Sequence, residues 1–173
     1  MLAEAAEWAA GVLCVAALFL LTRNFIFRTA LISGPSMEPT LYHGERVIVM
    51  KLPYIFGKPK LNDVVAFPYR ENPSQLFVKR VIGLPGDVID IIDRRMVING
   101  VELDDAFTEG LMISVGDVAF PITVPDGAYF VMGDHRNSSN DSRFTNVGCI
   151  NKKEMLGKLV LRFWPLDAFG KIR

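Results

Sequence analysis

A serine stands in the middle of a stretch rich in proline and glycine, SGPSMEPTL at residues 33–41, and its hydroxyl is a candidate nucleophile. Two prolines and a glycine within six residues exclude both a continuous helix and a central strand, so we expect a stiff, irregular loop around Ser36. Rigid loops often carry reactive groups. A proline-rich linker between two segments is the alternative interpretation of this stretch alone.

Lys79 is one candidate for the base that a serine nucleophile needs. In the strand-like run FVKRV at residues 77–81, alternation places Lys79 on the same face as two apolar residues and Arg80 on the opposite face. An ammonium held among apolar side chains loses hydration, which lowers its pKa towards neutrality and leaves a fraction of free amine. Lys79 is therefore a candidate general base, and an exposed strand lysine is the alternative.

Two histidines offer a different base. His43 lies seven residues beyond Ser36, and His135 follows Asp134 in a polar loop. Composition alone therefore leaves a Ser-His-Asp triad open beside a Ser-Lys pair.

That polar loop, GDHRNSSNDSR at residues 133–143, is dense in short hydrogen-bonding side chains. It is either an ordinary solvated loop of Asx and Ser turns or a buried network that orients a base. In the second interpretation Ser139 bonds to Lys79, and Asp141 pairs with Arg143 to hold the loop.

Length and composition limit what the rest of the chain does. The chain has 173 residues, half of them hydrophobic, which is enough for one domain with a real core and a small elaboration. Its formal net charge is zero, so no nucleic-acid partner is expected. Cys14 and Cys149 lie in different settings, which argues against a disulfide, and no Cys/His cluster has zinc spacing. We expect neither a cofactor nor a metal.

The N-terminal segment is predicted to be a retained membrane anchor. Residues 5–21 are apolar except for Glu7, and their continuation to residue 27 reaches the length of a bilayer core. A removed signal peptide and a buried core helix are the alternatives, but the chain lacks the basic start of a signal peptide. Arg23 and Arg28, which follow the segment, favour a C-terminal domain on the inside, the opposite of what the function argued below requires.

After the anchor the chain shows short β-branched runs separated by Gly and Pro, with no long amphipathic helix beyond residue 28. This pattern predicts a mostly β, antiparallel domain behind one N-terminal transmembrane helix. An Asn99-Gly100 pair predicts a turn within one arm of a hairpin. We expect strands at residues 45–50, 63–67, 75–82, 88–92, 96–103, 120–124, 128–132 and 158–164, and a helical turn at 151–156.

Four motifs in order resemble the motif set of bacterial type I signal peptidases, the serine-lysine dyad family S26. They are SGPSMEPTL at 33–41, DVVAF at 63–67, KRVIGLPGD at 79–87, and the loop from GDHR to DSR at 133–143. The resemblance runs from about residue 32 to residue 165, nearly the whole chain outside the anchor. It implies a membrane-bound serine endopeptidase with a β fold shared with self-cleaving repressors. Such enzymes remove signal peptides after small residues of the Ala-X-Ala type.

The resemblance also implies roles for individual residues. Ser36 would be the nucleophile and Lys79 the general base. Support for this pair would come from Ser139, Asp141, Arg143 and Asp134. Shallow apolar pockets for the small residues before the cleavage site would be lined by Ile32, Leu41 and Val78.

Three positions depart from the family pattern. Some members carry a hydroxyl two residues before the nucleophile, where it helps to bind the oxyanion, and here that position is Gly34, as in other members. The oxyanion hole would then depend on the Ser36 amide with a backbone group or water, and Ser33 is a candidate helper. His135 stands where the family usually has Asn, and Asn62 where Gly often precedes the aspartate.

The resemblance implies an organisation and a set of partners. Residues 1–28 would be the anchor with its flanks and 29–173 the β-rich catalytic domain, with an elaboration at about 88–128. The protein would sit in the cell membrane as a single-pass protein with its catalytic domain outside the cytoplasm. Its partners would be exported precursors and membrane lipid, with the export machinery as an additional candidate.

Two competing hypotheses remain. A Ser-Lys self-cleaving regulator would need a DNA-binding domain where this chain has its apolar N-terminus. A non-catalytic, membrane-anchored β module that binds partners would be insensitive to substitution of Ser36 and Lys79.

Overall fold

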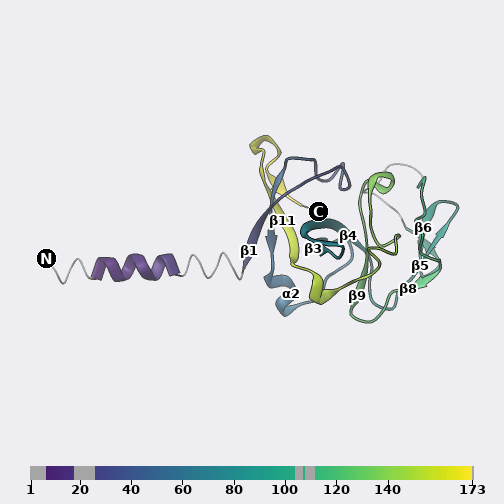
Figure 1. The fold of residues 1–173 in the computed structure, drawn as a ribbon, viewed down its shortest axis with the longest axis horizontal. Helices are drawn as coiled ribbons and strands as arrows, with labels where there is room; N and C mark the ends of the chain where they lie inside the picture. The colour runs from purple at the N-terminus through teal and green to yellow at the C-terminus, as the bar shows by residue number, and fades with distance from the viewer. Residues whose placement is uncertain (1–6, 18–25, 104–106, 108–111, 173) are drawn as a thin grey trace.

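The computed structural model describes residues 7–17, 26–103, 107 and 112–172. Residues 7–17 form a helix with exposed side chains that lies apart from the β-sheets (Figure 1). Within the described residues, no helix has both the length and the apolar character needed to cross a bilayer. The predicted anchor includes residues 18–25, which lie outside the described residues.

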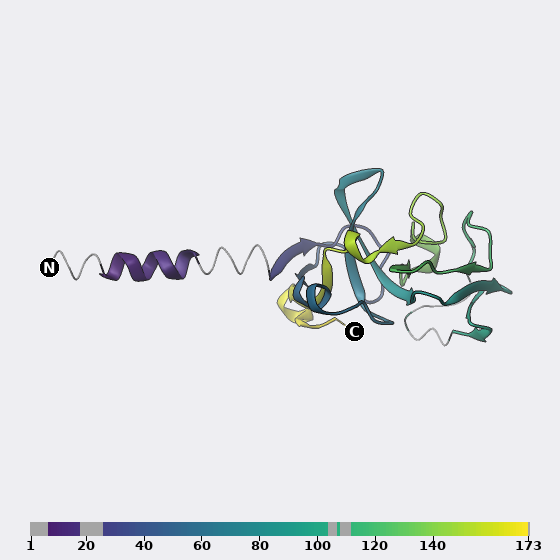
Figure 2. The ribbon, with the colours of Figure 1, turned by 90° about the horizontal axis from the view of Figure 1, so that it is seen from below.

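One antiparallel sheet forms the larger part of the domain (Figures 1 and 2). Its strands pair in the order β1-β2-β11-β3-β4-β9-β10, and β12 pairs with β11. The bounds are β1 (Phe27–Leu31), β2 (Arg46–Met50), β3 (Val64–Tyr69), β4 (Asn72–Gly83), β9 (Ala128–Met132), β10 (Ile150–Asn151), β11 (Gly157–Trp164) and β12 (Gly170–Lys171). The mostly antiparallel β domain is therefore confirmed.

Side chains that alternate along β3 are buried on both faces of the sheet. Val65 and Phe67 pack into one hydrophobic cluster, whereas Val64 and Ala66, on the other face, pack into a second. All four side chains are at most 2% exposed. Because full burial of a Val or Phe side chain contributes roughly 1.5–3 kcal/mol, β3 is a strong central element that fixes its neighbour β4.

A smaller sheet lies at the far end of the domain from the N-terminal helix (Figure 1). Its order is β7-β6-β5-β8, with bounds β5 (Val88–Ile92), β6 (Arg95–Ile98), β7 (Val101–Glu102) and β8 (Ile122–Thr123). The turn between β6 and β7 is the predicted Asn99-Gly100 pair, where both residues have positive φ, as a type I′ turn requires. These strands fall within the predicted elaboration, whose boundaries as a separate unit stay a prediction.

Helices within residues 26–172 of the described chain are single turns. They are α2 (Leu52–Phe56), η1 (Arg136–Ser138), η2 (Lys152–Glu154) and η3 (Leu166–Ala168). The η2 turn agrees with the helical turn expected near residue 151. The sequence did not predict β1, which begins at Phe27 and extends the sheet into residues assigned to the flank of the anchor.

Candidate active site

The loop that carries Ser36 joins β1 to β2 and is fixed at both ends. The Ile32 N–H donates to the Glu45 carbonyl at 2.8 Å, which closes the loop where the two strands end. Inside the loop the Leu41 N–H donates to the Met37 carbonyl at 2.8 Å. Its prolines and these bonds leave the backbone little freedom, so the hydroxyl of Ser36 is held in one place.

Lys79 lies on β4, and its side chain contacts Ser36 on this loop. Its amine lies 2.8 Å from the Ser36 hydroxyl oxygen, to which it donates a hydrogen bond. Lys79 is 3% exposed, and its amine lies 5.0 Å from the centre of the Phe77 ring, two residues earlier on the same face. The strand alternation thus brings together the two residues that were predicted to react.

The surroundings of Lys79 shift its protonation. The pKa of the Lys79 amine is lowered from 10.5 to about 8, chiefly by burial; the Asp141 and Asp134 carboxylates act in the opposite direction, and the nearby Arg143 guanidinium acts with burial. With a pKa near 8, roughly a tenth of the amine is neutral at pH 7. A neutral amine within hydrogen-bond distance of a serine hydroxyl is able to accept its proton.

A buried ion pair holds the polar loop behind the lysine. Asp141 accepts two hydrogen bonds from Arg143, at 2.8 Å to its Nε and 2.9 Å to a terminal nitrogen, and both side chains are 0% exposed. Asp141 also accepts from the Gly133 N–H at 3.1 Å, and Arg143 donates to the Arg136 carbonyl at 2.6 Å. This network ties both ends of the loop together.

A second buried ion pair, between Arg80 and Asp134, lies on the other face of β4, and the sequence did not predict this pairing. Arg80 makes a two-pronged contact with Asp134 at 2.8 and 2.7 Å, and the Thr40 hydroxyl donates to the same carboxylate at 2.5 Å. The Arg80 guanidinium also lies 3.7 Å from the centre of the Phe107 ring. The available signal was the position of Arg80 opposite Lys79 in the strand; Asp134 was assigned to the support of the Ser36–Lys79 pair, but not to Arg80.

Ser139 does not make its predicted hydrogen bond. Its buried hydroxyl has no partner among the described residues, whereas Lys79 donates to Ser36. The hydroxyl instead lies against the backbone of Gly133, so close that a side chain there would come within 2.4 Å of it. The missing Cβ of Gly133 therefore creates the space that Ser139 occupies.

Neither histidine reaches the Ser36 hydroxyl. His43 is exposed, and its Nδ1 accepts a hydrogen bond from the Gly34 N–H at 3.2 Å. His135 contacts Ser36 through the backbone, because its N–H donates to the Ser36 carbonyl at 3.1 Å. Its ring Nδ1 is buried without a partner within the described chain. The geometry therefore favours Lys79 over either histidine as the base.

Among the described residues, no three His, Cys, Asp or Glu side chains lie close enough together to hold a metal ion.

A groove of about 550 Å³ runs past Ser36 between the end of β1 and the first half of β4. Ile32 and Val78, two of the residues that the family resemblance assigns to substrate pockets, line it. Leu41 does not line it, since this residue is fully buried in the hydrophobic cluster behind the groove wall. Among the strands that the structure describes, the part of β4 from residue 72 to 78 pairs only with β3, so its other edge is open to an extended peptide.

The amide of Ser36 is available as a donor. It has no hydrogen-bond acceptor among the described residues. Gly34, two residues earlier, has φ of 89° and no atom within 4 Å of the position of a Cβ, so this side of the loop is open. A backbone N–H beside the reactive hydroxyl is where an oxyanion hole is expected.

Comparison with known proteins gives consistent matches over most of the chain. The family model described as "Signal peptidase, peptidase S26" matches residues 5–164. A signal peptidase I of Bacillus licheniformis is 36% identical over 172 residues, covering 95% of this chain and 91% of the relative. Signal peptidase I P of Bacillus subtilis subsp. natto is 38% identical over 170 residues, covering 93% and 90%. A solved signal peptidase I of Enterococcus faecalis is 34% identical, covers 59% of this chain and 97% of that one, and has a TM-score of 0.49.

Proposed function

Because the chain belongs to the signal peptidase family S26, and is therefore a serine peptidase, we propose that it removes signal peptides from exported precursors with a Ser36–Lys79 dyad. The observation that carries the proposal is the 2.8 Å contact between the Lys79 amine and the Ser36 hydroxyl, inside a buried site beside an open strand edge. Asp141, Arg143 and Asp134 are proposed as positioning residues for this pair.

The first half of the reaction forms an acyl-enzyme. Neutral Lys79 takes the proton of the Ser36 hydroxyl while the oxygen attacks the carbonyl carbon of the scissile bond. The charge that develops on the carbonyl oxygen is stabilised by the Ser36 N–H. The tetrahedral intermediate then collapses, and Lys79 gives its proton to the leaving amine, which departs as the new N-terminus of the mature protein.

The second half releases the signal peptide. A water molecule attacks the ester on Ser36, and Lys79, neutral again, accepts the proton of that water. Collapse of the second intermediate returns a proton to the Ser36 oxygen and frees the carboxylate end of the signal peptide. The same amine therefore serves both steps, and no cofactor is required.

The groove supports cleavage after small residues. An extended precursor that pairs with the open edge of β4 presents alternate side chains to the groove wall. Ile32 and Val78 fill part of that wall with branched side chains, which leaves shallow apolar space. We propose that alanine-sized residues occupy it at the first and third positions before the bond.

The N-terminal segment is proposed to anchor the enzyme in the cell membrane, with the β domain on the extracytoplasmic side. The signal peptide of a precursor is itself hydrophobic and enters the same membrane. Anchoring both molecules in one bilayer raises their effective concentration without new contacts.

A precursor assay tests this function. The full chain in detergent is expected to cut a purified precursor at one bond, preceded by Ala-X-Ala, as read by mass spectrometry of both products. Replacing the alanine before the bond by tryptophan is expected to lower kcat/KM by about 100-fold or more, because a bulky side chain clashes with the wall at Val78. Equal cleavage of both precursors would contradict the proposed specificity, and Ser36→Ala enzyme is the control for contaminating protease.

The pH dependence of the reaction is expected to report Lys79. The base is active when neutral, so kcat/KM should rise with pH through an apparent pKa of about 8 and then level off. An unperturbed lysine would instead place the rise at about 10.4, and a histidine base at about 6.5. A rise centred near 6.5 would contradict the lysine. The profile is measured with one precursor over a range in which circular dichroism shows the enzyme folded.

A further inference from the structure

A second groove lies between α2 and η2, away from Ser36, and we call it the lysine groove. It has a volume of about 510 Å³. Lys51, Lys152 and Lys153 line it together with apolar side chains, among them the buried Tyr54 and Met155. A groove that combines several ammonium groups with an apolar floor suits a ligand that carries a negative charge next to hydrocarbon.

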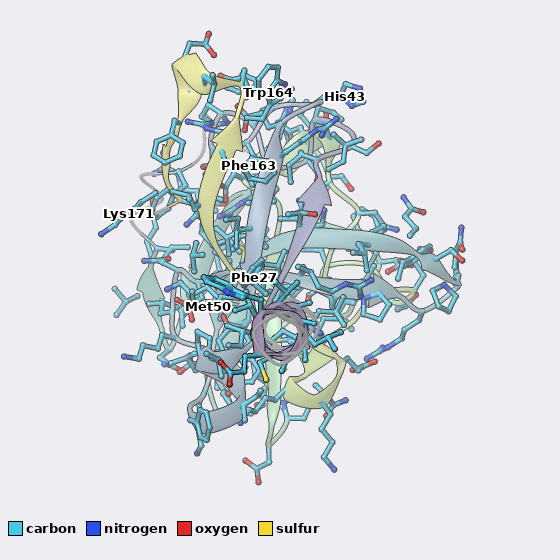
Figure 3. The ribbon with its side chains drawn as sticks, turned by 90° about the vertical axis from the view of Figure 1, so that its left-hand side faces the viewer. Phe27, His43, Met50, Phe163, Trp164 and Lys171 are labelled. Carbon is cyan, nitrogen blue, oxygen red and sulfur yellow. The ribbon has the colours of Figure 1, made fainter. Side chains whose placement is uncertain are left out.

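The lysine groove lies at the end of the domain where the chain arrives from its N-terminal segment. The Lys51 N–H donates to the Ile26 carbonyl at 2.9 Å, and the first residue of β1, Phe27, pairs with Met50. Figure 1 shows α2 at the same end of the domain as the N-terminal helix. Figure 3, viewed from the side on which the N-terminal helix lies, shows Phe27 and Met50 close to the axis of that helix in projection. A bilayer that held the chain just before Ile26 would therefore lie near Lys51 and α2.

Two neighbouring apolar side chains of α2 are exposed at the groove: Ile55 lines it, and Phe56 follows Ile55 in the sequence. Phe56 is 86% exposed and Ile55 is 58% exposed. Single exposed apolar residues are ordinary on a protein surface, but an adjacent pair next to a row of lysines is the pattern of an interfacial membrane contact.

Two carboxylates next to the lining residues of the groove are held by other groups. Asp63 accepts from the Tyr54 hydroxyl at 3.0 Å and pairs with Lys158 at 2.5 Å. Glu154 pairs with Arg70 at 3.0 Å and accepts from the Asn151 N–H. Both acids are thus engaged by other groups, which leaves Lys152 and Lys153 to act on a ligand.

We propose that the lysine groove binds the phosphate headgroup of an anionic phospholipid, while Ile55 and Phe56 enter the interfacial layer of the bilayer. The proposal rests on the proposed function, because the anchored chain is what brings α2 to a membrane. Each basic residue near an anionic surface strengthens the contact about fivefold. The contact would hold the domain in one orientation, so that the Ser36 groove keeps a constant height above the bilayer.

A fluorescent reporter at the tip of α2 tests the site. Phe56→Trp in a Trp8→Phe/Trp164→Phe background leaves one tryptophan, and the full chain is reconstituted in phosphatidylcholine vesicles with about 30 mol% phosphatidylglycerol. Bromine quenchers are placed on the acyl chains of the phosphatidylglycerol alone, or on the same amount of phosphatidylcholine alone. Stronger quenching by the brominated phosphatidylglycerol is expected, and salt at about 0.5 M should weaken the difference.

Two double variants, each of which removes two positive charges, show whether the lipid preference depends on the lysine groove. Lys152→Gln/Lys153→Gln is expected to weaken headgroup binding about 30-fold and to abolish the preference for phosphatidylglycerol. Arg94→Gln/Arg95→Gln removes the same charge from the β5–β6 turn in the smaller sheet, at the other end of the domain, and should keep the preference. Equal quenching by both lipids, or a preference that survives the lysine substitutions, would overturn the proposal.

Two further measurements distinguish a lipid site from a protein-binding groove and from a failure of the enzyme itself. A soluble oligoglutamate that shifts the reporter emission in detergent, without any lipid preference in vesicles, would identify a protein-binding groove and overturn the lipid assignment. Precursor cleavage in detergent is measured on the same variants, and wild-type rates are expected for Lys152→Gln/Lys153→Gln. Absence of cleavage in the parent enzyme would count against the proposed function, whereas loss of the lipid preference alone counts against this inference.

Discussion

Lys79→Met enzyme is expected to cut the precursor about 10³-fold more slowly than the parent, and Ser36→Ala enzyme to show no cleavage above background. The methionine keeps the length of the lysine stem but has no group that accepts the Ser36 proton, 2.8 Å away. Burial destabilises the charged form of the Lys79 amine, so its replacement by an apolar side chain of similar length should leave the fold intact. Initial rates with one precursor, together with circular dichroism, measure both effects.

The histidines provide the matched controls for this experiment. His43→Ala and His135→Ala are expected to retain most of the activity, since the described contacts link neither ring to the Ser36 hydroxyl. Loss of activity in His135→Ala with a normal rate in Lys79→Met would indicate a triad. Full activity in both Ser36→Ala and Lys79→Met would instead indicate that cleavage comes from another protein and that the domain is a binding module.

Arg143→Met is expected to destabilise the protein by about 3–5 kcal/mol, because it leaves the Asp141 carboxylate buried and without its counter-ion. The change is measured as the shift in the urea midpoint of the full chain in detergent. Arg95→Met is the matched control. It removes one arginine from a pair with Glu102 in which both side chains are more than half exposed, and such pairs contribute about 1 kcal/mol or less.

A double replacement separates the lost charge partner from lost packing. Asp141→Leu/Arg143→Met removes both buried charges, so much of the stability lost in the single variant should return. If the double variant is as unstable as Arg143→Met, the hydrogen bonds of this pair to the surrounding backbone matter more than the mutual attraction. The rate of precursor cleavage by the same variants shows whether the Asp141–Arg143 pair helps to position Lys79.

The sequence predicted most of the strands because their signals are local. β-branched runs with Gly and Pro between them mark β2 to β6, β9 and β11, and the Asn99-Gly100 pair marks a turn. The alternation of side chains along β4 was enough to predict that Lys79 and Arg80 lie on opposite faces of the strand. β1 was missed because its first residue, Phe27, continues the hydrophobic N-terminal segment, and composition does not show where a membrane segment ends and a strand begins.

The partners of the site residues could not be predicted from local signals. The contacts of Asp134 with Arg80 and Thr40 join three segments that are far apart in the sequence. Ser139 could be placed in the right loop, but its hydrogen bond depends on which way one hydroxyl points, and here it lies against Gly133. Such details are set by packing between loops, which a pattern of residue types does not encode.

The assignment of neighbouring residues in β4 to opposite faces limits how this segment can evolve. Lys79 meets the hydroxyl of Ser36 on one face, and Arg80 meets the carboxylate of Asp134 on the other. A register shift of one residue would turn each side chain of β4 to the opposite face. Shifted one way, Arg80 would take the place of Lys79 beside the nucleophile, and a guanidinium does not deprotonate; shifted the other way, Lys79 would take the place of Arg80 beside Asp134, and Ser36 would lose its base. An insertion or deletion within β4 would change this register and separate Lys79 from Ser36, so the length of the strand is constrained more strictly than its exposed side chains are.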